Sequence, residues 1–228
     1  MDRLYEDTDK AFLIRFGNTT FGDAVRVTAP FLRHPKGIRD IEGWYISHVR
    51  RSEFILLVFE HQCEVALVNL EQVYRAVGDR VMVAHLTGTD FDAQTQPLFS
   101  PDIYRRLYKP FHKDLKEWVH RHTSWETPIH TDGSVRALFP DIIAAGFDVL
   151  NPVQCSAVGM NPVELKQELG ELVLFWGGGA DAQFTLPFGT PDEVQREVRS
   201  HLCIFGRGEA MSLDRSTTSS RLYPSRTC

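Results

Sequence analysis

The sequence has few cysteines, no block of basic residues and no long apolar run. Its four cysteines form no Cys-x-x-Cys pair, which excludes a disulfide framework and a zinc ribbon. The net charge is -5, so we expect no basic surface that would attract nucleic acid. The first residues are mostly polar and no later segment is long enough to span a bilayer. We therefore predict a cytoplasmic protein with neither a nucleic-acid nor a membrane partner.

The 228 residues have the composition of a globular domain, with 43% hydrophobic and 24% charged residues. A short apolar run at 11–16 predicts a buried strand, and apolar residues at helical spacing predict a long helix from Ser52 to about Val77. From Val81 onward, strand and helix patterns alternate in about four units. This alternation predicts an α/β fold, either a doubly wound sheet or a (β/α)8 barrel.

Three predicted helices begin with a capping residue followed by proline. These starts are Ser100-Pro101, Asn161-Pro162 and Thr190-Pro191, and in the last two a glutamate lies three positions after the cap. The apolar run 172–176 is bounded by glycines and predicts a parallel strand that is covered on both faces.

Polar residues follow the predicted strands, where α/β proteins place their active sites. Asp90 follows a Gly-Thr turn. Its carboxylate could act as a base or bind a substrate N-H group, and the alternative is that it only caps the turn. His130 and Asp132 point the same way along an extended segment, which suits two metal ligands or an acid-base pair. The glycines at 177–179 would let backbone amides approach an anionic group. Trp176 either lines a cavity or packs in the core.

Several of these segments, in the same order, resemble the uroporphyrinogen decarboxylase superfamily. They are GTDFDAQ at 88–94, HTDGSV at 130–135, GFDVLNPVQ at 146–154, GMNP at 159–162, FWGGGADAQ at 175–183 and LPFGTPDEV at 186–194. The resemblance extends from about Lys10 to Phe205 and implies a TIM barrel. The sequence departs from the family pattern at Asp92, Glu126 and Ala182, where the resemblance implies Gly, Lys and Thr.

The resemblance implies decarboxylation of uroporphyrinogen to coproporphyrinogen, a cofactor-free step of porphyrin biosynthesis, as the main function. The superfamily also includes zinc methyltransferases that move methyl groups between corrinoids and thiols, with zinc on a His-x-Cys pair. Here His130 is followed by Asp132 at the Cys position, and a carboxylate is a harder donor than a thiolate. The second prediction is therefore a corrinoid-dependent methyltransferase with zinc on His130 and Asp132, and the third is a catalytically inactive fragment.

For either enzyme, the predicted catalytic residues are Asp90, His130 and Asp132. The predicted substrate-binding residues, which would contact a tetrapyrrole or a methyl-group carrier, are Gln94, Asn151, Gln154, Trp176, Gly177, Gly178 and Asp181.

Both ends of the chain depart from the barrel that the resemblance implies. We expect residues 1–205 to form a partial TIM barrel that lacks amino-terminal strands and the last strand. A complementary barrel segment or a homodimer would then cover the exposed strand edges. Residues 206–228 are predicted to be an aberrant tail. One permitted back-translation of Gly208 to Cys228, read from the last base of the Gly208 codon, gives GGYVFGPVHNIQPLVPIENV, which the resemblance implies here. We therefore hypothesise a frameshift in the gene or its sequencing.

Overall fold

The computed structural model describes residues 5–15, 17–28, 31–34, 38 and 40–206. The hypothesised frameshift and the predicted loss of the last strand fall on residues 207–228, outside the described residues. The division of the chain after residue 205 therefore stays a prediction.

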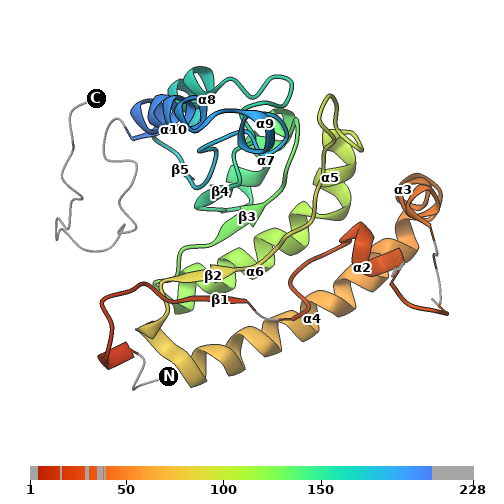
Figure 1. Cartoon of the computed structure of the whole chain (residues 1–228). Coiled ribbons are helices and arrows are strands. Elements are labelled where there is room, and N and C mark those ends of the chain that lie inside the picture. The colour runs from red at the N-terminus through yellow and green to blue at the C-terminus, as the bar shows by residue number, and fades with distance from the viewer. Residues whose placement is uncertain (1–4, 16, 29–30, 35–37, 39, 207–228) are drawn as a thin grey trace.

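Within this part of the chain, short parallel strands lie side by side in chain order (Figure 1). They are β1 (Leu13–Arg15), β2 (Val83–His85), β3 (Pro128–His130), β4 (Val149–Asn151) and β5 (Leu174–Phe175). Strand β1 pairs with β2, β3 pairs with β4 and β4 pairs with β5, and single bridges such as Val83 to Glu126 join β2 to β3. A doubly wound sheet reverses its strand order, whereas a (β/α)8 barrel keeps chain order. The strand order is thus that of a barrel, and the described strands form an open arc.

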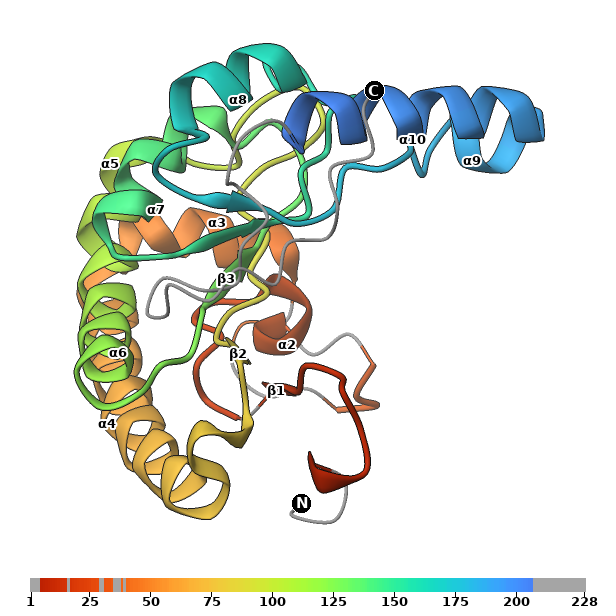
Figure 2. The same ribbon diagram turned by 90° about the vertical axis from the view of Figure 1, so that its left-hand side faces the viewer.

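Helices cover one side of this arc (Figure 2). The longest described helix, α4 (Ser52–Val77), packs against α6 (Lys109–His122). The other described α-helices are α2 (Ala24–Thr28), α3 (Ile41–Arg50), α5 (Pro101–Leu107), α7 (Phe139–Ala144), α8 (Pro162–Leu169), α9 (Thr185–Phe188) and α10 (Pro191–Phe205). No helix in the described ranges combines the length and the apolarity that crossing a bilayer requires.

The predicted long helix and the two proline-marked caps with glutamate are confirmed. Helix α4 has the predicted bounds. The Asn161 side chain accepts hydrogen bonds from the first turn of α8, and Thr190 forms a capping box with Glu193 at the start of α10. The parallel strand predicted within 172–176 is present but shorter than expected, since only Leu174 and Phe175 are in β5. Both residues are half-buried, so the expectation that this strand is covered on both faces is wrong.

A buried ion pair lies at the amino-terminal end of the strands. Asp148 immediately precedes β4, and its Oδ2 accepts hydrogen bonds from Lys116 Nζ at 2.7 Å and from the Thr127 hydroxyl at 2.7 Å. His120 Nε2 lies 3.2 Å from the same oxygen. Burial alone would raise the pKa of Asp148, but the His120 hydrogen bond and the Lys116 charge hold it well below its ordinary value. This end of the sheet is therefore built from paired charges.

Candidate metal centre

Asp90, His130 and Asp132 meet at the opposite, carboxyl-terminal edge of the arc. His130 ends β3, Asp132 lies two residues further on, and Asp90 follows β2. One ligand atom from each side chain lies within 4.8 Å of the other two, and His130 Nε2 is 3.8 Å from Asp132 Oδ2. The structure thus brings the three predicted catalytic residues together, and it adds Asp90 to the two predicted metal ligands.

A chain of hydrogen bonds fixes the orientation of the His130 ring. Its Nδ1 lies 2.8 Å from Asn151 Oδ1, which can only accept, so Nδ1 is the donor. The Asn151 amide in turn donates to the backbone carbonyl of Trp176 at 3.1 Å, which sets which way the amide faces. In the neutral ring Nε2 of His130 then carries the free lone pair, and it is this nitrogen that lies beside Asp132.

The two carboxylates of the cluster are close enough to affect each other. The Asp132 backbone N-H donates to Asp90 Oδ1 at 3.3 Å. Much of the Asp90 side chain is open to solvent, yet desolvation raises the pKa of its carboxyl, and the like charge of Asp132 raises it further. A cation between the two carboxylates would remove this repulsion.

A cavity of about 300 Å³ adjoins the cluster through Asp132. Gln94 and Gln154, both predicted to bind substrate, line this cavity and exchange two amide hydrogen bonds of 3.1 and 2.6 Å. Gln154 Oε1 also accepts from the Gly133 N-H at 2.9 Å. The predicted residues Asp181 and Gly178 belong to the same lining, so the carboxyl ends of β3, β4 and β5 share one polar cavity.

The glycines after β5 have a packing role, and their predicted binding role stays a prediction. Gly177 and Gly178 have φ values of 103° and 73°, a region that favours glycine. A Cβ on Gly178 would lie 2.6 Å from the Val153 carbonyl oxygen, so the loop after β5 packs directly on the loop after β4. Asp181 Oδ1 accepts the backbone N-H groups of Gln183 and Phe184, which is turn-capping chemistry.

Sequence reasoning did not assign a site role to two buried polar residues, one at the end of β2 and one in the loop that follows it. His85 ends β2, its ring centroid is 6.0 Å from that of His130, and it pairs in register with Arg15 of β1. Its Nε2 is buried without a partner among the described residues. Burial lowers the pKa of His85 to about 4, and the charges of Arg15 and His130 act in the same direction. No sequence signal marks His85, because a single histidine in an apolar strand is usually a core residue.

Asp92 is the buried acid of the loop that follows β2. Both carboxyl oxygens lie out of contact with solvent and have no hydrogen-bond partner within the described ranges. Burial raises the pKa of this carboxyl to about 7. The departure from the family glycine at this position was the only sign of it in the sequence.

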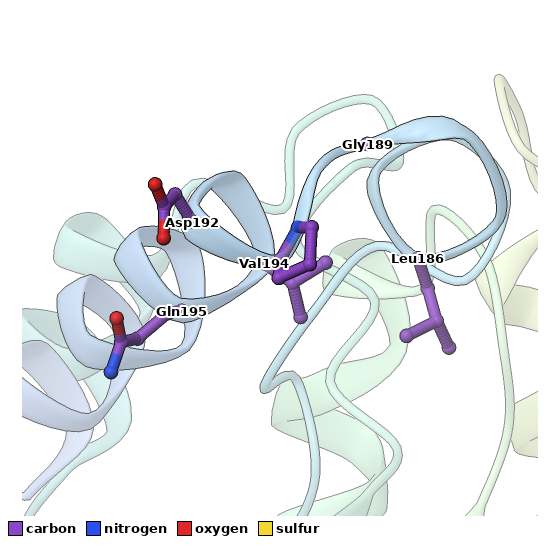
Figure 3. Close-up of a pocket in the computed structure, with 6 residues that line it drawn as sticks. Leu186, Gly189, Asp192, Val194 and Gln195 are labelled. Atoms are coloured by element: carbon purple, nitrogen blue, oxygen red, sulfur yellow. The ribbon is translucent and has the colours of Figure 1, made fainter.

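A second cavity, of about 550 Å³, lies between α9 and the start of α10 (Figure 3). It is lined by Leu186, Gly189, Pro191, Asp192, Val194 and Gln195. The labelled side chains do not converge on a common point, and none of the predicted site residues is among them. This depression offers no chemistry, and the strand-end cluster is the stronger candidate.

The donor set of the cluster fits a divalent metal. An imidazole nitrogen and two carboxylates supply three ligands, the number that catalytic zinc sites take from the protein while they keep a position for substrate. The Asn151 carbonyl that holds His130 Nδ1-H is the kind of outer partner that metal-binding histidines have. The fit is therefore supported by the orientation of His130 as well as by proximity.

Comparison with known proteins supports the fold alone. No protein-family model matches the chain, and no curated protein matches its sequence. A solved structure of a methyltransferase from Methanosarcina mazei is similar, with a TM-score of 0.59 and 15% sequence identity. The similarity covers 86% of this chain and 50% of that one, so the chain spans half the length of the methyltransferase. Membership of the uroporphyrinogen decarboxylase superfamily stays a prediction.

Proposed function

We propose that the chain carries the metal and substrate site of a metal-dependent methyltransferase, with zinc as the metal and a methyl-corrinoid as the methyl donor. The observation that carries this proposal is the convergence of Asp90, His130 and Asp132 within 4.8 Å at the carboxyl ends of the strands. The structural similarity to a methyltransferase supports the same choice.

The chain's own residues would each have a defined task. His130 would present Nε2 to the metal because Asn151 holds its Nδ1-H. Asp90 and Asp132 would supply two negative oxygens, and the Asp132 N-H to Asp90 bond holds the two loops together. A metal bound here would act as a Lewis acid that lowers the pKa of a substrate thiol. The cavity beside Asp132 would seat that substrate.

The decarboxylase prediction has less support from this site. Uroporphyrinogen carries many carboxylates, and its recognition requires cationic side chains. The cavity that the described residues form has three carboxylate side chains in its lining, Asp132, Asp181 and Glu197, and neither lysine nor arginine. A polyanionic substrate would therefore meet repulsion in this cavity.

The test is an activity measurement on the purified full-length chain with zinc, a methyl-corrinoid and a small thiol. The proposal predicts equal amounts of demethylated corrinoid and methyl thioether, with a loss of at least about tenfold in rate for Asp132→Asn. Asp192→Asn, an exposed carboxylate on the first turn of α10, is the matched control and should keep full activity. Turnover of uroporphyrinogen by metal-free protein would favour the decarboxylase. No turnover by a chain that unfolds cooperatively would favour the inactive fragment.

A further inference from the structure

The cavity next to the metal centre has an unusual charge balance. Its three carboxylates, Asp132, Asp181 and Glu197, come from three different elements of the chain. The lining contributed by the described residues includes neither lysine nor arginine, and its one histidine, His201, lies with Nδ1 3.2 Å from the Gly179 carbonyl oxygen. Since like charges that line one cavity repel each other, a cation bound there would lower the free energy of the folded protein.

Of these three side chains, Glu197 is the one with a carboxylate oxygen closed off from solvent. It lies on α10, and its Oε1 accepts the Asp181 backbone N-H at 3.0 Å. Its Oε2 is closed off from solvent and has no hydrogen-bond partner in the described part of the chain. A buried carboxylate oxygen without a partner is costly, which makes Glu197 the group most in need of a positive neighbour.

A second metal ion would not satisfy this part of the cavity. In the described ranges, Asp90, His130 and Asp132 form the one group of three side chains that offers a metal ligand set. Beside Glu197 the lining includes the apolar residues Val153, Ala180 and Ala182. Such walls suit the methylene groups of an organic cation, and the Gln94–Gln154 amide pair offers oxygens that accept N-H bonds.

We infer that this cavity binds a small organic ammonium ion, with the positive nitrogen near Glu197 and the other end of the molecule toward Asp132. The substrate class of the metal centre is therefore an amine-bearing small molecule. This inference rests on the proposed function, because the cavity and the metal centre share Asp132.

The experiment measures binding of three probes of equal length to the full-length protein in the presence of a chelator. n-Butylammonium, n-butanol and butyrate differ only in charge, and the chelator keeps metal out of the measurement. We expect n-butylammonium to bind at least about tenfold more tightly than either of the others, the size of one charge-assisted contact. Equal binding of the three probes, or a preference for butyrate, would overturn the inference.

A substitution at Glu197 tests whether this residue causes the preference for n-butylammonium. Glu197→Gln keeps an oxygen for the Asp181 N-H and should reduce n-butylammonium affinity about tenfold. Thermal stability should be retained, because the variant keeps that hydrogen bond and removes the charge of an oxygen that has no partner among the described residues. Glu60→Gln, an exposed residue of α4, is the control and should change nothing. Unchanged ammonium affinity in Glu197→Gln would contradict the inference.

The ammonium inference and the proposed metal centre can fail independently of each other. Zinc affinity, measured without chelator, should be the same in Glu197→Gln and in the unaltered protein, since Glu197 is outside the metal group. Zinc binding without ammonium preference would refute the substrate class alone. Ammonium preference without zinc binding would refute the metal centre alone.

Discussion

The two ends of the parallel strands differ in whether their acidic side chains have cationic partners. At the amino-terminal end, Asp148 is 5% exposed and is bonded to Lys116 and Thr127, with His120 close by. At the carboxyl-terminal end, Asp90 and Asp132 face each other. Paired charges stabilise a fold, whereas unbalanced charges cost stability and are kept where a ligand balances them. The difference is a further argument for the carboxyl-terminal end as the candidate functional site.

The two buried aspartates show the contrast most sharply. Asp148, with its partners, has a pKa held well below its ordinary value, while Asp92, with no partner among the described residues, has a pKa raised by burial to about 7. An ionised aspartate thus keeps its partners at the amino-terminal end of the strands, whereas at the carboxyl-terminal end its ionisation costs stability.

The largest effect is expected from breaking the paired end. Asp148→Ala leaves Lys116, which is 1% exposed, without its carboxylate and should lower the free energy of unfolding by about 3–5 kcal/mol at pH 7. Urea unfolding measures this. A matched double variant, Asp148→Leu with Lys116→Met, should recover much of the loss because neither charge of the pair remains without the other. A loss below about 1 kcal/mol for Asp148→Ala would show that the pair does not stabilise the fold.

The next largest expected effect is a gain in the free energy of unfolding. Asp92 has its pKa raised from 3.8 to about 7, so its contribution to stability is present below pH 3.8 and lost as the pH rises to about 7. Asp92→Asn does not titrate and should raise the free energy of unfolding at pH 8 by roughly 2–4 kcal/mol, with little gain at pH 4. Unfolding in chelator at both pH values measures it. Equal gains at the two pH values would contradict the assignment.

A smaller effect is expected at the residue that orients the metal ligand. Asn151→Leu removes the acceptor for His130 Nδ1-H and should weaken zinc binding about 10- to 100-fold. Competition with a zinc-sensitive dye measures the affinity, and Asp192→Asn is the control. Full affinity in Asn151→Leu would show that His130 does not bind the metal through Nε2.

The smallest expected effect is a gain in zinc affinity. Asp132→Cys replaces a carboxylate by a thiolate, which zinc binds more strongly, and should tighten zinc binding about tenfold. The same competition assay measures it. Weaker zinc binding in this variant would place Asp132 outside the ligand set.

The sequence predicted much of the fold because its signals are local. The Asn161 and Thr190 caps and the apolar spacing of 52–77 act within a few turns of chain, and the structure places those helices where predicted. The strand-end placement of His130 and Asp132 followed from strand-helix alternation. The residue patterns alone left strand order open, because pairing between β2 and β3 joins residues far apart in the sequence, and the chain order of a barrel was implied only by the family resemblance.

The same limit applies to the site. The sequence placed Gln94 and Gln154 on different loops but could not show that they bond to each other. It gave no sign of His85 or Glu197, because burial and the lack of a partner are properties of the folded chain. Asp181 was predicted to contact substrate and also caps a turn, which residue type alone does not reveal.

The most direct test of the metal centre is zinc stoichiometry combined with zinc-edge X-ray absorption on the full-length chain. The account predicts one zinc per chain, bound by nitrogen and oxygen donors that include one imidazole and no sulfur. It also predicts loss of that zinc when Asp90→Asn and Asp132→Asn are combined. A sulfur ligand, an absence of bound zinc, or zinc that persists in the double variant would contradict the account.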